Sequence, residues 1–226
     1  MSDVTTQSGS VVLIHGAWHG AWCWDGVVAE LNAMGVPVTT VELPFSGFDD
    51  DVAAARSVII AGGENTVVCA HSGGGVTLSE AAAGLSNVTR LVYLAAFMVD
   101  EGEAIEELLA VAPTDLFDAV SFEGPYGSVD PGRARDLFYG DSEDVVVAAI
   151  LPQLRPMHMG GASPGGRPAW KDVPTTFVVC ANDHALAPEV QRVMAARAHE
   201  IVEWPTDHSP FLTRPRDVAL LLRSYL

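Results

Sequence analysis

The stretch that most constrains the fold is residues 67–75, with the sequence VVCAHSGGG. A short apolar, β-branched run ends abruptly in one serine and three glycines, and a helix-compatible segment, residues 76–83, follows at once. Strand, sharp turn and helix form the context in which a G-x-S-x-G motif becomes a nucleophile elbow, although Ala70 replaces the first glycine here. Ser72 is therefore expected in a strained, exposed turn. The alternative is a glycine-rich turn that binds phosphate or nothing.

Strand-like and helix-like segments alternate on both sides of this turn. The expected strands are residues 11–14, 36–41, 67–71, 90–97, 175–181 and 200–204. The expected helices are residues 24–34, 50–60, 76–83, 188–198 and 214–226. Such alternation predicts an α/β fold with a doubly wound, mostly parallel six-stranded sheet, strand order 2-1-3-4-5-6, and helices on both faces.

Residues 98–170 depart from this alternation. They hold acidic helix-like pieces at residues 101–111 and 142–151, separated by proline, glycine and tyrosine. An insertion of this kind between sheet strands is expected to form a helical cap within a single domain, residues 1–226. The alternative is a set of ordinary surface helices with no part in substrate binding.

Composition and charge exclude several classes of partner. The formal net charge is −17, which argues against nucleic acid and anionic membrane surfaces because both need a basic patch. No apolar run is long enough to span a bilayer, and the polar first ten residues carry no secretory signal. The three cysteines fit no zinc spacing, so no metal is expected, and their odd number suggests a reducing compartment. A cytoplasmic protein is therefore expected, and a homodimer is left open.

Three residues at or just beyond predicted strand ends form a candidate catalytic triad. Their chain order is Ser72, Asp183 and His208, the order of nucleophile, acid and base in one class of serine hydrolases. Ser72 would attack, His208 would take its proton, and Asp183 would orient the imidazole. Each residue alone has another explanation: Asp183 can be a turn residue, and His208 can be an exposed loop histidine. Asp100, after the fourth strand, is the competing acid.

The loop after the first strand, residues 15–22 with the sequence HGAWHGAW, would complete the site. Its backbone N–H groups can turn outward, so those of Ala17 and Gly73 would form an oxyanion hole. Trp18 and His71 are expected to line the substrate pocket. The alternatives are that Trp18 belongs to the core and that His71 only shapes the pocket wall.

Four stretches together resemble a known family. Residues 12–24, 70–74, 177–183 and 207–211 are similar to the small α/β-hydrolases that include plant methyl-ester esterases, hydroxynitrile lyases and related bacterial esterases. The resemblance maps the family's triad and oxyanion roles onto Ser72, Asp183, His208, Ala17 and Gly73. It implies no cofactor, and it is weakest over the cap.

The resemblance implies a serine-dependent carboxylic-ester hydrolase that acts through an acyl-enzyme. Hydroxynitrile lyases of this group usually have a threonine and a lysine where this chain has Gly16 and Ser209, which favours ester hydrolysis. The alternatives are a carbon–carbon lyase and a small-molecule-binding protein without turnover. The apolar and methionine side chains of the insertion, with the acidic charge, favour a neutral, small-to-medium apolar ester.

Overall fold

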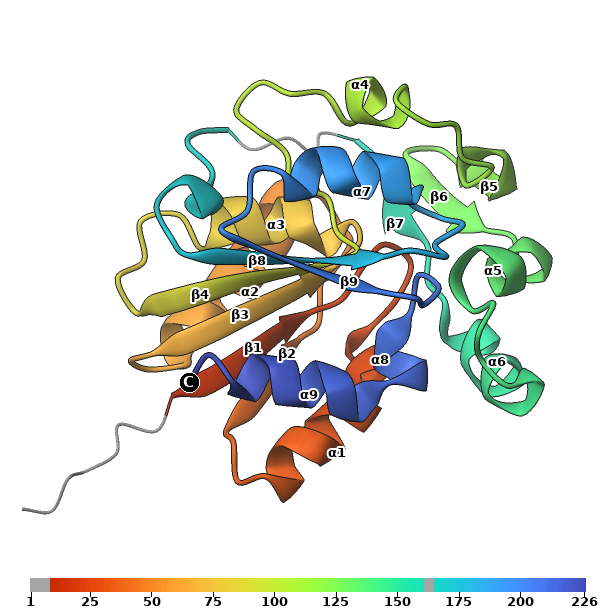
Figure 1. The fold of residues 1–226 in the computed structure, drawn as a ribbon. Helices are drawn as coiled ribbons and strands as arrows, with labels where there is room; N and C mark the ends of the chain where they lie inside the picture. The colour runs from red at the N-terminus through yellow and green to blue at the C-terminus, as the bar shows by residue number, and fades with distance from the viewer. Residues whose placement is uncertain (1–8, 161–164) are drawn as a thin grey trace, which may run out of the picture.

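The central element is a six-stranded sheet in which every neighbouring pair of strands is parallel (Figure 1). The computed structural model describes residues 9–160 and 165–226, so the expectation for the first eight residues lies outside the described part. The strands of this sheet are β1 Ser10–Ile14, β2 Val38–Val41, β3 Thr66–His71, β4 Val88–Leu94, β8 Thr175–Cys180 and β9 Glu200–Trp204. Their order, β2-β1-β3-β4-β8-β9, confirms the predicted topology, with β8 and β9 as the fifth and sixth strands.

Helices cover both faces of this sheet, as expected for parallel strands joined by crossovers. One face carries α2 Phe48–Ala61, α3 Gly74–Ala81 and α7 Pro188–Ala195. The other face carries α1 Asp25–Ala33, α8 Pro210–Thr213 and α9 Pro215–Arg223 (Figure 1). Successive residues of β3 point into the two layers alternately: Val68 and Ala70 into the first, Val67 and Cys69 into the second. Because β3 is buried on both faces, its sequence reads as a continuous apolar run.

The chain leaves the sheet between β4 and β8 to form the insertion. Its regular elements are α4 Ile105–Leu109, β5 Val120–Glu123, β6 Tyr126–Val129, α5 Pro131–Phe138, α6 Asp144–Ile150 and β7 Met157–His158. Short 3₁₀ turns lie within the insertion at Phe117–Ala119, Leu151–Gln153 and Ala169–Lys171, and one lies outside it at Ala21–Trp24. The antiparallel sheet β5-β6-β7 was not expected, because its strands span only two to four residues, too few for a periodic pattern.

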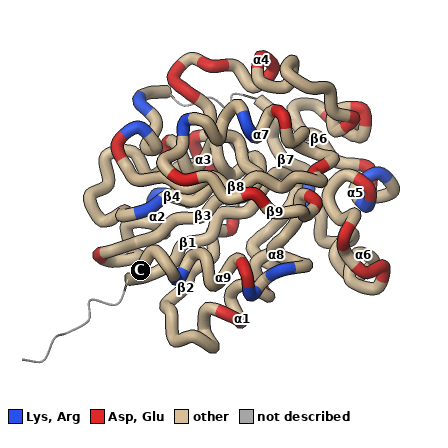
Figure 2. The backbone as a smooth tube through the Cα atoms, in the orientation of Figure 1, with Lys and Arg blue, Asp and Glu red and all other residues tan. Residues whose placement is uncertain are grey.

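A third apolar cluster joins the insertion to the loop after β1. Trp18 packs there with Leu137, Phe138 and Tyr139 of the insertion. The insertion is thus fixed by core-like packing to the loop at residues 15–22, which we call the oxyanion loop after its predicted role. Acidic residues are spread over the periphery, including α4 and α6, with few basic residues between them (Figure 2). Among residues 9–160 and 165–226, no helix combines the length and the apolar character that crossing a membrane requires.

Candidate active site

Ser72 lies in the sharp turn between β3 and α3, in the left-handed region with φ of 51°. Its carbonyl oxygen accepts hydrogen bonds from the backbone N–H groups of Gly75 and Phe97, both at 3.0 Å. A Cβ atom on Gly74 would lie 2.3 Å from the carbonyl oxygen of His15, and one on Gly75 would lie 2.4 Å from that of Phe97. The glycines are therefore required by close backbone approach, and Ser72 itself is only partly buried.

Asp183 and His208 form a buried pair at the carboxyl ends of β8 and β9. The Nδ1–H group of His208 donates to Asp183 Oδ2 at 2.6 Å. Asp183 Oδ1 accepts from the backbone N–H groups of Ala185 and Leu186, both at 2.8 Å. Because Nδ1 holds the ring proton, Nε2 of His208 is left as the basic nitrogen.

Ser72 lies at the same edge of the sheet as this pair, at the carboxyl ends of the parallel strands. The ring of His71, the neighbour of Ser72, has its centroid 4.5 Å from that of His208. Within the described residues, no hydrogen bond joins Ser72 Oγ to His208. Catalytic hydrogen bonds are often long before substrate binds, so this geometry is compatible with a serine–histidine pair.

Asp100, the competing acid, lies elsewhere. It forms an ion pair with Lys171, which holds the pKa of the Asp100 carboxyl below its usual value. The structure therefore brings Asp183 to His208 and leaves Asp100 on the insertion.

Two histidines fix the oxyanion loop. The backbone N–H of Leu43 donates to His15 Nε2 at 3.0 Å, so His15 Nδ1–H donates to the Gly16 carbonyl at 2.9 Å. His19 bonds the Ala17 carbonyl through Nδ1 at 2.7 Å. Burial lowers the pKa of His15 to about 3 and that of His19 to about 4, so both rings are neutral at neutral pH.

The two predicted oxyanion donors lie beside one another. A Cβ atom on Gly73 would lie 3.4 Å from both the backbone nitrogen and the Cβ of Ala17. The N–H of Gly73 belongs to the start of α3, where the helix dipole favours negative charge. This arrangement would suit an oxyanion formed next to Ser72.

His71 and Trp18, the predicted substrate-binding residues, are both buried. His71 Nε2–H donates to the backbone carbonyl of His208 at 2.9 Å, whereas its Nδ1 has no partner in the described part of the chain. Burial lowers the pKa of His71, so the ring is neutral. Trp18 donates from Nε1 to the Gly127 carbonyl at 3.0 Å and stacks on Phe138 of the insertion. A role of either residue in substrate binding stays a prediction.

A narrow cavity of about 40 Å³ opens beside the predicted oxyanion donors. We call it the oxyanion pocket. Its lining residues are Ala17, Leu43, Phe45, Phe48, Asp51, Gly73, Val76, Thr77, Met157, His158 and Gly160. The sequence reasoning did not single out Asp51 as a pocket residue. Asp51 lies four residues before Ala55 and eight before Ile59, both on the buried face of α2, and this helical spacing is the signal that would have found it.

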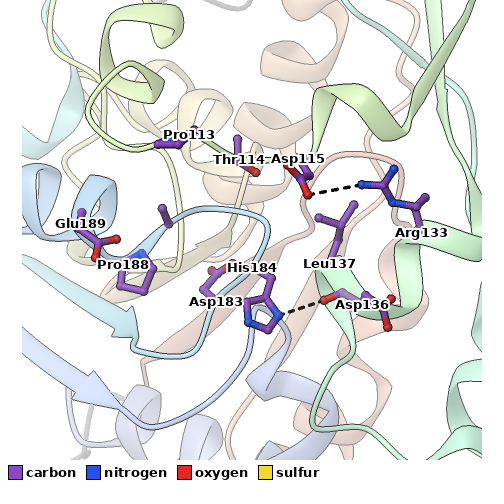
Figure 3. Close-up of a pocket in the computed structure, with 11 residues that line it drawn as sticks. Pro113, Thr114, Asp115, Arg133, Asp136, Leu137, Asp183, His184, Pro188 and Glu189 are labelled. Atoms are coloured by element: carbon purple, nitrogen blue, oxygen red, sulfur yellow. Dashed lines mark hydrogen bonds and ion pairs between the residues drawn. The ribbon is translucent and has the colours of Figure 1, made fainter.

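A second cavity, of about 530 Å³, lies on another side of Asp183, between the insertion and the turn after β8 (Figure 3). Two interactions join residues that line it. Arg133 forms an ion pair with Asp115 at 3.7 Å, and His184 forms a hydrogen bond with the Asp136 carbonyl at 3.3 Å. Ser72, Ala17 and Gly73 are not among its lining residues. Ser72 lines neither of the two cavities, and Ala17 and Gly73 line only the oxyanion pocket.

Known proteins match almost the whole chain. Alpha/beta hydrolase nvfD from Aspergillus novofumigatus (strain IBT 16806) is 28% identical over 238 residues, 95% of each chain. Methylesterase 18 from Arabidopsis thaliana is 27% identical over 245 residues, covering 92% of this chain and 93% of the relative. The crystal structure of polyneuridine aldehyde esterase has a TM-score of 0.85 at 21% identity, covering 96% of this chain and 99% of the other. The family model of the alpha/beta hydrolase family matches residues 11–219, and the chain belongs to that family.

Proposed function

We propose that this protein is a serine-dependent carboxylic-ester hydrolase that acts through an acyl-enzyme. The observation that carries the proposal is the buried Asp183–His208 pair, 2.6 Å apart, on the side of the sheet where Ser72 occupies a strained turn. The esterase names of methylesterase 18 and polyneuridine aldehyde esterase are consistent with it.

The proposed reaction begins when His208 Nε2 takes the proton from Ser72 Oγ as this oxygen attacks the ester carbonyl carbon. The carbonyl oxygen becomes an oxyanion that accepts hydrogen bonds from the N–H groups of Ala17 and Gly73. His208 then gives its proton to the leaving alcohol, and the carbon–oxygen bond breaks to leave the acyl-enzyme. His208 then deprotonates a water molecule as its oxygen attacks the acyl carbon, and returns the proton to Ser72 Oγ as the bond between this oxygen and the acyl carbon breaks and the acid leaves. Asp183 stabilises the imidazolium at each stage.

The oxyanion pocket supports a small-to-medium, mainly apolar ester as substrate. Most of its lining side chains are apolar: Leu43, Phe45, Phe48, Val76 and Met157. The net charge of −17 would repel polyanionic substrates.

Replacing Ser72 by alanine is the direct test. We expect hydrolysis of short aryl esters to fall by at least about a thousandfold, because the nucleophile is lost while the oxyanion donors remain. A fluorophosphonate should label Ser72 in the wild-type protein, as located by peptide mass spectrometry. Ser224→Ala, which changes an exposed serine at the end of α9, is the control and should keep full activity. Undiminished turnover in Ser72→Ala would contradict the proposal.

The same preparations separate the two alternatives. A folded protein that refuses the label would favour ligand binding without turnover. Cleavage of mandelonitrile would favour a lyase. Against the lyase, a Cβ atom on Gly16 would lie 2.8 Å from both Ser72 Cβ and His71 Nδ1, which leaves no space for the threonine of hydroxynitrile lyases.

A further inference from the structure

One carboxylate in the oxyanion pocket is buried without a complete set of partners. Asp51 is 8% exposed, and its Oδ1 accepts from the backbone N–H of Phe45 at 2.8 Å. Its Oδ2 accepts no hydrogen bond in the part of the chain that the structure describes. Burial raises the pKa of this carboxyl. Asp51 lines the cavity, and its Oδ2 has no donor among the described residues, so this oxygen is available to accept a hydrogen bond from a ligand there.

The insertion supplies a matching donor from the other side of Phe45. The backbone N–H of His158 donates to the Phe45 carbonyl at 3.1 Å, so Asp51 and His158 bind the same residue through its two backbone groups. His158 Nδ1 accepts from the N–H of Gly160 at 3.3 Å, so the ring proton is on Nε2. This Nε2–H has no acceptor within the described residues.

The nearest basic side chain is already engaged. Arg155 pairs with Glu42 and donates to the carbonyls of His19 and Leu43 at 3.0 and 3.1 Å. Its charge lowers the pKa of Asp51 without forming an ion pair with it. The carboxylate is thus partly balanced in charge, but its Oδ2 lacks a hydrogen-bond donor within the described residues.

We propose that Asp51 and His158 form a subsite for a hydroxyl group carried by the ester substrate. The hydroxyl would donate a hydrogen bond to Asp51 Oδ2 and accept one from His158 Nε2–H. A hydroxyl group provides one donor and an acceptor, so it matches this pair. A cavity of about 40 Å³ has room for only a few non-hydrogen atoms. The hydroxyl-bearing end of an otherwise apolar, neutral ester fits this pocket. The inference rests on the proposed ester hydrolysis and names its substrate class.

The test compares esters that differ in a single group. Methyl β-hydroxybutyrate is paired with methyl isovalerate, in which a methyl group replaces the hydroxyl. Methyl ω-hydroxyhexanoate is paired with methyl heptanoate, because the reach of the subsite sets the chain length. In at least one pair, we expect kcat/KM to be about tenfold or more higher for the hydroxy ester, since the hydroxyl bonds a charged acceptor. The matching amino esters should show a smaller increase in kcat/KM, because their N–H groups would meet another donor, His158 Nε2–H.

Asp51→Asn distinguishes recognition from a structural role. The amide can keep an oxygen on the Phe45 N–H, so it must present its NH₂ group to the pocket. A substrate hydroxyl would then face two donors, so kcat/KM for the hydroxy ester should become about equal to that of its partner ester. Methyl acetoacetate carries an acceptor in place of the hydroxyl, and its kcat/KM should rise. Asp49→Asn, on the exposed side of the same helix, should leave both ratios unchanged. An unchanged hydroxyl preference in Asp51→Asn would show that Asp51 only fixes Phe45.

The outcomes also separate this inference from the function on which it rests. Turnover that depends on Ser72 but shows no hydroxyl preference would overturn the subsite and leave the hydrolase standing. Turnover that persists in Ser72→Ala would overturn the hydrolase. Protection of Ser72 from fluorophosphonate by β-hydroxybutyramide, compared with isovaleramide, measures binding without turnover. Equal protection by the two amides would contradict the subsite.

Discussion

Gln191 determines where the Asp183 carboxylate lies. This buried side chain of α7 donates from Nε2 to Asp183 Oδ2 at 2.8 Å and to the Leu186 carbonyl at 2.7 Å. Its Oε1 accepts from the backbone N–H of Cys180, the last residue of β8, at 2.9 Å. The N–H groups of Ala185 and Leu186 donate to Oδ1, so the carboxylate accepts three hydrogen bonds besides the one from His208. Gln191 is therefore a positioning residue.

Replacing Gln191 by leucine should affect both stability and rate. The change leaves the Cys180 N–H without a partner and removes one bond to Asp183, so the free energy of unfolding should fall by about 1–3 kcal/mol. We expect kcat to fall while KM changes little, because the side chain does not line the oxyanion pocket. Urea unfolding and ester kinetics measure the two effects. Gln153→Leu, on an exposed turn of the insertion, is the matched control, and an equal effect there would contradict a positioning role.

Residues with a motif around them could be identified from the sequence, and residues without one could not. Ser72, Asp183 and His208 stand at or just beyond strand ends in a recognisable order. Asp51 and Gln191 are single polar residues on apolar helix faces, and their roles depend on what packs opposite. Chain order alone does not contain that information, because the opposing groups are distant in the sequence.

At the scale of elements, the insertion is tied to the catalytic loops by specific polar contacts. Tyr139, just after α5, bonds His19 Nε2 through its hydroxyl group at 2.7 Å, and His19 in turn bonds the Ala17 carbonyl. Asp141 Oδ2 accepts from the backbone N–H of Asp207 at 2.8 Å, and Asp207 Oδ2 accepts from that of Asp141 at 3.0 Å, so the loop before His208 is also fixed to the insertion. The insertion therefore supports both the loop that holds Ala17 and the loop that carries His208.

Tyr139→Phe tests this support with the smallest possible change. Loss of one hydroxyl leaves His19 Nε2 buried without a donor, which should lower the free energy of unfolding by about 1–3 kcal/mol. The Ala17 N–H should also be less well fixed, so kcat should drop more than KM rises. Tyr126→Phe removes a tyrosine hydroxyl of an exposed residue of the insertion and serves as the control. A full rate in Tyr139→Phe would show that the oxyanion loop holds its position without the insertion.

Long periodic elements were predicted well, and short ones were missed. The four inner strands of the main sheet, β1, β3, β4 and β8, are largely apolar runs buried between two helical layers, which is why the sequence predicted them. The edge strands β2 and β9 are only partly buried. The predicted helix at residues 50–60 matches α2, with differences of one or two residues at its ends. The sheet β5-β6-β7 forms only because distant pieces of the insertion pair, which local propensity does not specify.

At the scale of the whole molecule, the site is built around histidines that burial keeps neutral. His15, His19 and His71 all have a lowered pKa, and burial is the largest cause in each case. In the unfolded chain each imidazole regains a pKa of about 6.5. As the pH falls below this value, the unfolded chain binds protons that the native state excludes, so the contribution of these groups to stability is present above about pH 6.5 and is lost in acid.

We therefore expect the free energy of unfolding to fall between about pH 7 and about pH 5, with a slope that approaches 4 kcal/mol per pH unit if all three imidazoles act. Asp51 and Asp207 act in the opposite sense, because their pKa values are raised by burial and their protonation favours the native state. Their effect grows as the pH falls toward the ordinary range of a carboxyl, so it opposes that of the histidines at the acid end of this window.

Urea unfolding at a series of pH values measures the slope, and His19→Gln assigns part of it. Glutamine cannot protonate, so the variant should have a slope lower by about 1.4 kcal/mol per pH unit, whatever stability the substitution itself costs. His199→Gln changes an exposed histidine and is the control. A slope near zero, or one that His19→Gln leaves unchanged, would contradict a neutral His19 in the native state. It would also remove the reason to regard the oxyanion loop as fixed by uncharged imidazoles.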